Sequence, residues 1–529
     1  MYNTSEPDHI DVFDHSTQIT QHSIRMFRPR SPGVRISNTS TYMNIYHISA
    51  ECYPAAKAGG LADVVGSLPK YQCKAGITSS VVLPHYLTPW IRSQESVVVY
   101  QGKAPIRGAM FDFSVSRIDS SVLGFDLFLI YIDNRFDRPG IYIDPWTGHP
   151  YWDEAERYFM FQIAALEWLA SLAEKPDLIH CHDHHTALIP FMMKEAFRFE
   201  SFRETPSVLT IHNGEYQGRY AMDRYVELPA FNLEHLGLLD WEGQMNSLAA
   251  GIKTAWKVTT VSEGYMKELL GFCHGLESLL QAEESKTMGI LNGIDTDTWN
   301  SSTDPLLPYH YNRKTYRKGK QQNQQALRTQ FQLAEGPPLI TFIGRLVLEK
   351  GADLIPGLVR EVLDRNMDVV FLMLGTGSPE IERMFDELNH AYPGRFFAKL
   401  EYNESLAHQI YAGSDFIMMP SRVEPCGLNQ MYAMRYGTIP IVRATGGLAD
   451  TVQDISNDGG YGLVFDQFSK EEAFRSLERA IELFQDKKRF DKIRREIMSF
   501  DFSWQASAQV YQTMYQSLLK LARVPSADG

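Results

Sequence analysis

The segment 57–63 (KAGGLAD) places two glycines and two charged side chains between a predicted strand and a predicted helix. Glycines let the backbone approach a ligand closely, and the N-terminus of the following helix offers unsatisfied N–H groups to a phosphate. A tight turn that binds nothing is the alternative for such a Gly-Gly pair. The flanking charges favour a phosphate site, with Lys57, Gly59, Gly60 and Asp63 as its candidate residues.

A second cationic segment, 344–351 (GRLVLEKG), directly follows the apolar run 339–343. Arg345 leaves the carboxyl end of that predicted strand, and Lys350 lies five residues further on. Ligands of open α/β sheets bind outside those carboxyl ends. Two cations, one of them able to make a bidentate contact, suit a diphosphate. The alternative is a pair of solvated surface cations.

The segment 424–430 (EPCGLNQ) follows another apolar run and opens a helix that is expected to begin at Pro425 and end near Tyr436. Backbone N–H groups at this helix N-terminus could hold sugar hydroxyls or phosphate, with Glu424 as a hydrogen-bond acceptor beside them. The alternative is a carboxylate that only complements the helix dipole. The candidate backbone donors are Cys426, Gly427 and Leu428, and the Cys426 thiol is interpreted as packed rather than nucleophilic.

Three further short signals carry less information. The turn 445–450 (TGGLAD) resembles the first segment chemically, with Gly446 and Gly447 as candidate ligand contacts, but it is weak alone. The GTG at 375–377 fails as a dinucleotide fingerprint, because Glu380 occupies the third glycine position. No Walker A sequence occurs, and the acidic pair at 295–297 (DTD) lies at a predicted interdomain link and is not interpreted as a metal site.

Histidines gather at the ends of two predicted strands, in 180–185 (HCHDHH) and 210–213 (TIHN). Four histidines and a cysteine within six residues invite a zinc interpretation. Alternation along a strand splits these side chains between two faces, however, and HExxH is absent. A polar cleft wall is therefore favoured, with Asp183, His212 and Asn213 as candidates and no metal ligand predicted.

Bulk composition narrows the function classes. The 529 residues carry a net charge of −13, and a nucleic-acid-binding protein would more often present a basic surface. Five scattered cysteines argue against a disulfide framework and fit a reducing cytosol. We find neither a signal peptide nor an apolar run of membrane-spanning length. These features predict a cytoplasmic protein that binds neither nucleic acid nor membrane.

Two series of short apolar runs alternate with amphipathic helical patterns. This pattern predicts an α/β fold with two doubly wound domains of buried parallel strands. The polar, basic stretch 313–328 is interpreted as a solvated loop and helix face. The expected strands are 44–49, 79–84, 125–132, 177–181, 208–211 and 257–261 in the first series, and 339–343, 369–374, 398–400, 416–419 and 439–442 in the second.

The domain boundaries follow from this pattern. Residues 1–42 are polar and aperiodic and are expected to be a disordered leader, although Met43 directly before the first strand leaves open that the leader is an artefact. The N-terminal domain is assigned to 43–291, the C-terminal domain to 292–501, and a final helix to 502–522.

Taken together, these residues resemble the bacterial glycogen synthase and plant starch synthase family. The order and spacing hold from Met43 to about residue 520. The long matching blocks are KAGGLADVVGSLPK at 57–70, LNGIDTDTW at 291–299, GRLVLEKG at 344–351 and EPCGLNQMYAMRYGTIPIVRATGGLADTV at 424–452, and the short ones are DRPGIY at 137–142, HDHHT at 182–186 and TIHNGEYQG at 210–218.

The resemblance implies a GT-B fold, in which a cleft separates two Rossmann-like domains and the last helix returns to the first domain. It implies a retaining glucosyltransferase that uses ADP-glucose as donor and the non-reducing end of an α-1,4-glucan (glycogen) as acceptor, without a metal or other cofactor. Arg345, Lys350 and Lys57, with the Gly59-Gly60 backbone, would then bind the diphosphate. Glu424, aided by the backbone at 426–427, would hold glucose hydroxyls, and His212 and Asp183 would lie beside the transferred sugar.

The sequence departs from the family at two positions. The family's HDWH block reads HDHH, with His184 in place of Trp, and EPCGLTQ reads EPCGLNQ, with Asn429 in place of Thr. The first change alters the packing of the cleft wall, and the second alters polar contacts near the diphosphate. Neither removes a charged candidate residue. For the acceptor, either a sugar-binding or a packing role remains open for the aromatic side chains of Tyr142, Trp146, Tyr151 and Trp152.

Two other functions stay open. One is a transferase of the same fold that uses UDP-glucose or another acceptor. The other is a catalytically silent protein that binds glucan or regulates another enzyme. The cations Lys57, Arg345 and Lys350 argue against the second, because binding a neutral glucan alone needs no diphosphate site. The oligomeric state is not indicated by the sequence.

Overall fold

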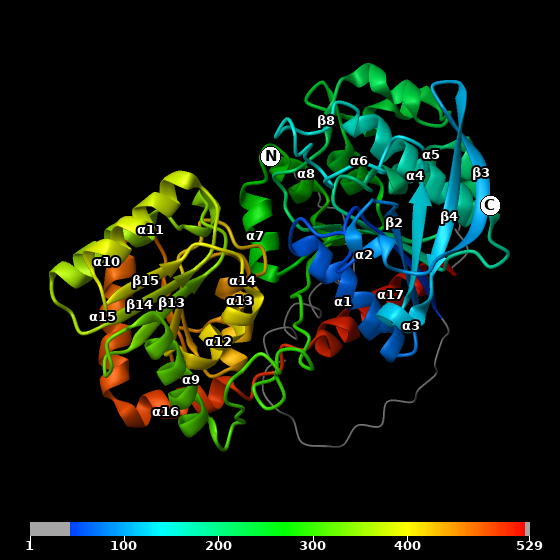
Figure 1. Ribbon diagram of the computed structural model, residues 1–529. Helices are drawn as coiled ribbons and strands as arrows, with labels where there is room; N and C mark the ends of the chain where they lie inside the picture. Colours follow the sequence, from blue (N-terminus) through cyan, green and yellow to red (C-terminus); the bar gives the residue numbers. More distant parts are fainter. Residues whose placement is uncertain (1–42, 524–529) are drawn as a thin grey trace, which may run out of the picture. The chain divides into compact units, whose positions relative to one another are not determined.

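The computed structural model describes residues 43–523, so the predicted leader at 1–42 lies outside the described residues. Within this range the chain forms two lobes, each built on its own large sheet (Figure 1). The first large sheet has nine strands and the second has six. Mostly parallel strands flanked by helices in both lobes confirm the predicted α/β fold class.

The first sheet has the strand order β12-β11-β7-β6-β1-β2-β5-β4-β3. Seven strands are parallel, and β3 and β4 form an antiparallel hairpin at one edge. The sequence interpretation missed this hairpin, because its outer strand is largely exposed and lacks the continuous apolar run of a buried strand. The strands are β1 (Asn44–Ile48), β2 (Thr78–Pro84), β3 (Val97–Ile106), β4 (Ala109–Ile118), β5 (Asp126–Tyr131), β6 (Leu178–His182), β7 (Ser207–Ile211), β11 (Lys257–Thr260) and β12 (Thr287–Gly289).

Helix α1 shows how the local sequence builds the first lobe. Its apolar residues at i, i+3, i+4 and i+7 from Leu61 are buried, and the chain leaves the helix through Gly76 in the left-handed conformation, as the pattern predicted. The helices of this lobe are α1 (Gly60–Lys74), α2 (Pro89–Arg92), α3 (Ser120–Leu123), α4 (Glu154–Ser171), α5 (Leu188–Glu195), α6 (Ser247–Thr254), α7 (Glu263–Gly271) and α8 (Glu277–Ala282).

Shorter elements complete this lobe. A small three-stranded sheet has the order β8-β10-β9. Its strands are β8 (Arg219–Tyr220), β9 (Asp240–Trp241) and β10 (Gln244–Asn246), and the 3-10 helices are η2 (Phe197–Phe202), η3 (Met222–Glu227), η4 (Leu233–Leu238) and η5 (Glu284–Lys286).

The second sheet is parallel throughout, with the order β15-β14-β13-β16-β17-β18. Its strands are β13 (Leu339–Ile343), β14 (Val370–Leu374), β15 (Phe396–Lys399), β16 (Phe416–Met419), β17 (Ile439–Arg443) and β18 (Leu463–Phe465). Its helices are α9 (Tyr316–Phe331), η6 (Leu348–Lys350), α10 (Leu354–Asp364), α11 (Pro379–Ala391), α12 (Glu404–Gly413), α13 (Asn429–Arg435), α14 (Gly446–Thr451), α15 (Lys470–Gln485) and α16 (Lys487–Ile497).

The interpretation of 313–328 as a solvated loop and helix face was wrong at two of its cations. Lys320 on α9 is 2% exposed, and its ammonium donates to three backbone carbonyls and to Thr438 Oγ1. Arg328 is also buried, and its guanidinium donates hydrogen bonds to the carbonyls of Ala334 and Pro337. Local charge gave no sign that Lys320 is buried, because the groups that accept from its ammonium come from distant segments.

The last helix, α17 (Trp504–Ala522), packs on the first lobe beside α1 (Figure 1). Trp504, Tyr511 and Tyr515 lie in one buried cluster with Val64 and Leu68 of α1. The chain therefore passes between the lobes twice. The two passages meet where Ile294 N donates to the Phe502 carbonyl at 2.7 Å and Trp504 N donates to the Ile294 carbonyl at 3.2 Å.

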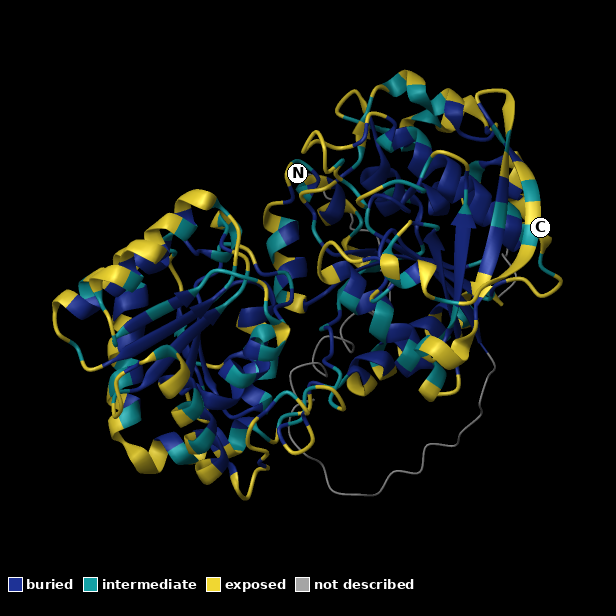
Figure 2. Ribbon diagram, in the orientation of Figure 1, coloured by how far each residue is buried: buried dark blue, intermediate teal, exposed yellow. Residues whose placement is uncertain are grey.

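Buried strands form the core of each lobe, and the outward faces of the helices are exposed (Figure 2). Among residues 43–523, no helix is both long and apolar enough to cross a membrane.

Candidate functional site

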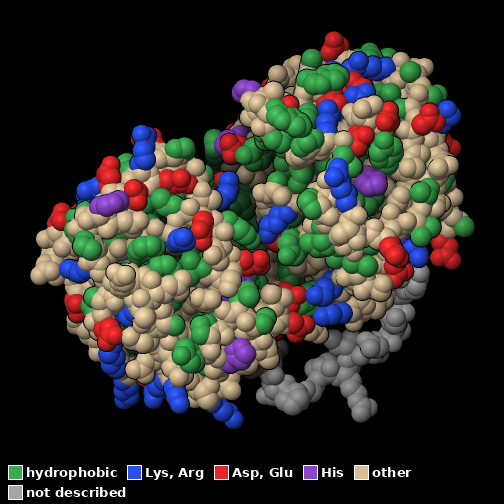
Figure 3. Space-filling view, in the orientation of Figure 1, with side chains coloured by type: hydrophobic (Ala, Val, Ile, Leu, Met, Phe, Trp, Pro, Cys, Tyr) green, Lys and Arg blue, Asp and Glu red, His purple; other side chains and the backbone are tan. Residues whose placement is uncertain are grey.

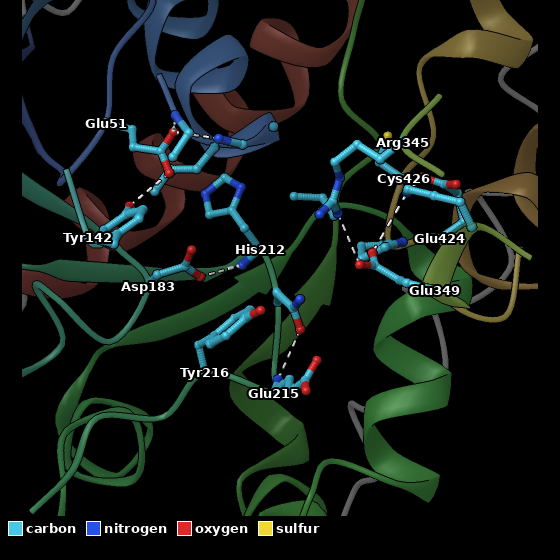
Figure 4. A pocket seen from close by; sticks show the side chains of 18 of the residues that line it. Glu51, Tyr142, Asp183, His212, Glu215, Tyr216, Arg345, Glu349, Glu424 and Cys426 are labelled. Carbon is cyan, nitrogen blue, oxygen red and sulfur yellow. Dashed lines mark hydrogen bonds and ion pairs between the residues drawn. The ribbon is translucent and has the colours of Figure 1, made fainter. Parts of the chain in front are cut away.

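A pocket of about 840 Å³ is lined by residues of both lobes. Figure 3 shows a hollow between the lobes, with charged side chains at its margins. In the close view, Glu51, Tyr142, Asp183 and His212 come from the first lobe and face Arg345, Glu349 and Glu424 of the second (Figure 4). The carboxyl ends of both parallel sheets supply these residues, as expected for an open α/β fold.

The second-lobe wall holds the predicted cations. Arg345 and Lys350 both line the pocket and follow β13, as predicted. Arg345 Nη2 lies 3.0 Å from Glu349 Oε2, and its side chain remains 65% exposed. Lys350 Nζ lies 2.7 Å from Glu424 Oε1, while Ser421 Oγ donates to Glu424 Oε2 at 2.8 Å. Because β13 pairs with β16, the loops that carry Lys350 and Glu424 are neighbours.

The loop after Glu424 differs from its predicted form. Helix α13 begins at Asn429, not at Pro425, so the backbone of 425–428 is a loop that leads into the helix. Gly427 has φ +69, a conformation that favours glycine, and this turn delays the start of the helix. The loop still lines the pocket through Cys426, Gly427 and Leu428, and burial raises the pKa of the Cys426 thiol to about 12, in keeping with a packed thiol.

Gly446 and Gly447 do not belong to the described pocket lining, and they support the loop from behind. Gly446 N donates to Glu268 Oε1 at 2.7 Å, and Gly447 N donates to the Glu424 carbonyl at 3.1 Å. The backbone N–H groups of both glycines are therefore already hydrogen-bonded within the protein. Gly447 thus holds the backbone of Glu424, and Gly446 links this segment to Glu268 of α7.

The first-lobe wall contains Gly59 and Gly60, as predicted, but Lys57 and Asp63 are not among its described lining residues. Lys57 Nζ instead lies 2.7 Å from Asp63 Oδ1. Lys57 is therefore held by Asp63 in an exposed ion pair, outside the described pocket lining.

Sequence reasoning missed Glu51, which organises this wall. Glu51 Oε2 accepts from Ala58 N at 2.5 Å and from Gly59 N at 2.8 Å, and Tyr142 OH donates to Glu51 Oε1 at 2.7 Å. Glu51 is 3% exposed and lines the pocket. The sequence offered one indication of this role, since Glu51 is an acidic residue shortly after the carboxyl end of the first strand.

His212, Asp183 and Asn213 all line the pocket. Asp183 Oδ1 accepts from His212 N at 2.7 Å, and Asp183 itself has the uncommon φ of +56. Burial raises the pKa of Asp183 to about 7, and burial lowers the pKa of His212 to about 3. The Asn213 side-chain oxygen accepts from Glu215 N at 3.0 Å, and its amide N–H groups have no hydrogen-bond partner within residues 43–523.

Of the four aromatic candidates, Tyr142 alone is among the described lining residues. Its ring stacks on His185 at 4.8 Å between ring centres. Tyr151 is buried under Arg138, whereas Trp146 and Trp152 are 77% and 84% exposed.

Among residues 43–523, two groups of side chains bring possible metal-ligand atoms within 4.8 Å of one another. The first is His47, His180 and His182, whose ring nitrogens have hydrogen-bond partners within the protein. The second is Glu154, His184 and His185 at the pocket wall. The hydrogen bonds of the first group favour a polar network over a metal site.

The lobes touch beside the pocket through helix α7 and the loops of the second lobe. Ser262 Oγ donates to the Pro425 carbonyl at 2.6 Å, and Gly264 N donates to Asp450 Oδ2 at 2.7 Å. Glu268 Oε1 accepts from Gly446 N, as described above. These contacts hold the 425–428 loop against the first lobe.

Comparison with known proteins gives consistent matches along the described chain. The family model for the starch synthase catalytic domain matches residues 44–282, and that for glycosyl transferases group 1 matches 323–496. The chain is 46% identical to the glycogen synthase of Flavobacterium johnsoniae, covering 90% of this chain and 100% of that protein. It is 37% identical, at the same coverage, to the glycogen synthase of Streptococcus sanguinis.

Among solved structures, the catalytic domain of starch synthase IV from Arabidopsis thaliana, bound to ADP and acarbose, matches with a TM-score of 0.80. That match has 32% sequence identity and covers 91% of this chain and 100% of the other.

Proposed function

Because this chain belongs to the glycogen and starch synthase family of GT-B glucosyltransferases, we propose that it transfers glucose from ADP-glucose to the non-reducing end of an α-1,4-glucan with retention of configuration. The observation that carries the proposal is the pairing of two pocket-lining cations, Arg345 and Lys350, with a first-lobe wall of polar side chains. The cations suit a diphosphate, and the polar wall suits sugar hydroxyls.

Charge stabilisation is the main role that these residues would play. Cleavage of the bond between glucose and phosphate leaves negative charge on the diphosphate. Arg345, Lys350 and the backbone N–H groups of the 426–428 loop would stabilise that charge. Glu424, fixed by Lys350 and Ser421, would accept hydrogen bonds from the glucose hydroxyls.

Retention requires either a covalent intermediate or attack from the face that the leaving group occupies. Six carboxylates belong to the described pocket lining. Glu51, Asp183, Glu349 and Glu424 are each held by hydrogen bonds or an ion pair, and the other two are Glu154 and Glu215. Because none of the four held carboxylates is poised as a nucleophile, front-face attack is preferred, with the leaving phosphate accepting the proton of the acceptor hydroxyl. Trapping a covalent glucosyl-enzyme would contradict this mechanism.

The choice of ADP-glucose rests on the relatives. The starch synthase IV structure holds ADP, and both bacterial relatives are named glycogen synthases. The cytoplasm is the proposed compartment, because all five cysteines are free, as is usual in a reducing compartment.

The decisive experiment measures incorporation of labelled glucose into glycogen from ADP-glucose and UDP-glucose, side by side and without added metal. Preferred use of ADP-glucose is expected. Use of UDP-glucose alone would retain the mechanism and reassign the donor.

A thermal-shift titration with ADP separates the enzyme from a silent glucan-binding protein. An ADP concentration of 100 times Kd is expected to stabilise the fold by about 2.7 kcal/mol. Absence of any shift, together with absence of glucose transfer, would favour the silent protein.

A further inference from the structure

Three histidines form a hydrogen-bonded row that begins at the pocket and leads into the first lobe. His212 follows β7 and lines the pocket, His182 ends β6, and His47 lies on β1. His212 Nε2 and His182 Nδ1 are 3.0 Å apart, and His182 Nε2 and His47 Nδ1 are also 3.0 Å apart. Neighbouring parallel strands place the three rings in line, because β7 pairs with β6 and β6 pairs with β1.

The inner end of the row meets Gln72 of α1. Gln72 Oε1 lies 2.8 Å from His47 Nε2 and accepts from Ser79 Oγ at 2.7 Å. Gln72 Nε2 donates to Tyr515 OH of α17 at 3.2 Å. Gln72 is 0% exposed, so its amide is held by protein groups on both sides.

The donor and the acceptor of each hydrogen bond in this row follow from the number of protons that each ring carries. Each neutral imidazole has one N–H donor and one bare acceptor nitrogen. Because a carbonyl oxygen only accepts, His47 must carry its proton on Nε2, which leaves Nδ1 bare. His182 must then donate from Nε2 and accept at Nδ1, so His212 must donate from Nε2.

These proton positions require that all three imidazole rings are neutral, and the burial of the row keeps them neutral. Burial lowers the pKa of His47 to about 4 and that of His212 to about 3, and it places the pKa of His182 well below its usual range. A charged imidazolium has no acceptor nitrogen, so one protonated ring would break the order of the row.

We propose that Gln72 is a positioning residue for glucosyl transfer, acting through His47 and His182 to keep the proton of His212 on Nε2 and its Nδ1 bare. His212 lines the pocket, and Nδ1 is its remaining ring nitrogen. His212 therefore offers the pocket a hydrogen-bond acceptor. That acceptor selects a ligand group that donates a hydrogen bond, such as a sugar hydroxyl. The catalytic consequence rests on the proposed function, whereas the proton position does not.

A second series of hydrogen bonds starts at Gln72 and agrees with the same assignment of donors and acceptors. Tyr515 OH accepts from Gln72 Nε2 and can therefore donate to His180 Nδ1, 2.7 Å away. His180 Nε2 then donates to Thr210 Oγ1 at 2.6 Å. The whole network would reverse only if the Gln72 amide turned over, which would put the His212 proton on Nδ1 and make His212 a donor to the pocket.

The test reads the proton positions directly. Protein labelled with 15N in its histidine rings is examined by long-range 15N–1H correlation, and the His212 signals are assigned by their loss in His212→Asn. The wild-type spectrum is expected to show the Nε2–H form of His212. A spectrum that shows Nδ1–H at His212 overturns the proposal, whatever the activity.

Variants separate this role from simple packing. Gln72→Met fills the same space without an acceptor, and we expect mixed His212 tautomers and a loss of kcat/KM of about 10- to 100-fold, as when other residues that orient a functional histidine are lost. Gln72→Glu keeps an acceptor for His47 and should stay within a few-fold of wild type. Ser79→Ala is the matched control, since it removes only the second donor to Gln72 Oε1, and it should leave both the spectrum and kcat/KM unchanged.

Each outcome has a definite meaning. Should Gln72→Met fail to fold, the wild-type spectrum and Gln72→Glu still decide the polarity. A Gln72→Met protein that folds with Nε2–H at His212 and unchanged kcat/KM overturns the positioning role. The expected spectrum in a protein that transfers no glucose would count against the proposed function alone.

Discussion

Lys350 Nζ lies 2.7 Å from Glu424 Oε1 in the pocket wall. The two residues are 74 positions apart in the chain and meet because β13 and β16 are neighbours in the second sheet. Glu424 is 7% exposed, so loss of Lys350 would leave a nearly buried carboxylate with Ser421 as its remaining described side-chain partner. The pair thus orients Glu424 while Lys350 keeps hydrogen-bonding capacity for an anion.

Arg345→Ala and Lys350→Ala are each expected to lower turnover by about 10²- to 10³-fold, because each removes a cation from the developing charge on the diphosphate. The measurement is the initial rate of glucose incorporation at saturating donor, with the far-ultraviolet circular dichroism spectrum as a check of folding. Arg360→Ala is the control, since Arg360 on α10 pairs with Glu387 outside the described pocket lining. Near-wild-type turnover in both pocket variants would disprove the assignment of these cations.

Gly264→Ala is expected to disturb the contact between the lobes. A Cβ at Gly264 would lie 2.5 Å from the Gly446 carbonyl oxygen, which is backbone and cannot swing aside. The 425–428 loop should shift, and kcat/KM should fall at least about tenfold, since small displacements in a site can cost about 10²-fold in rate.

Gly271→Ala, in the same helix α7, is the matched control. A Cβ at Gly271 would meet nothing within 4 Å, so this variant should behave as wild type. Equal kcat/KM for the two variants would show that the approach of α7 to Gly446 is unimportant for activity.

The buried histidines predict that the fold loses stability below neutral pH. Burial lowers the pKa of His47 to about 4, of His184 to about 4 and of His212 to about 3. The unfolded chain binds protons at these positions below about pH 6.5, and the folded chain does not, so the free energy of unfolding must fall from about pH 6.5 towards pH 4. Each such histidine contributes up to about 3 kcal/mol to the loss.

Asp183 acts in the opposite direction. Burial raises its pKa to about 7, so it favours the folded state at low pH and loses that contribution as the pH rises from about 4 towards 7. Because the buried histidines outnumber Asp183, the net stability should fall as the pH falls. Urea titrations at pH 7.5, 6 and 5 should therefore show a decreasing midpoint of unfolding. A midpoint that is constant or rises over this range would contradict neutral, buried histidines.

Removal of metal ions should leave activity unchanged. The nitrogens of His47, His180 and His182 are committed to hydrogen bonds, so the first candidate group has no free donor set for an ion. Dialysis against a chelator, followed by the incorporation assay without added metal, is the measurement.

The control addresses the second candidate group. His184 Nδ1 and His185 Nδ1 are buried without a partner in the described chain, so this group is where an ion would bind. His184→Trp introduces the residue that the family has at this position and removes one of these nitrogens. A chelator-sensitive activity that depends on His184 would show that the prediction of a metal-free site is wrong.

The sequence was sufficient to predict the two-sheet α/β fold, the family and several charged residues of the pocket wall. Continuous apolar runs mark parallel strands because both faces of such strands are buried, and the carboxyl ends of those strands locate the site. Arg345, Lys350 and Glu424 were found in this way. The exposed β3–β4 hairpin was not, since an edge strand that is open to solvent lacks the apolar run.

The pairing of distant side chains became known only from the folded chain. Lys57 meets Asp63 rather than the described pocket lining, Glu51 fixes the Gly59 backbone, and Lys320 is buried on carbonyls of remote segments. The row from Gln72 to His212 likewise depends on the order β7-β6-β1. Sequence patterns report the environment of each residue averaged over its local element, whereas a hydrogen bond or ion pair depends on which elements become neighbours when the chain folds.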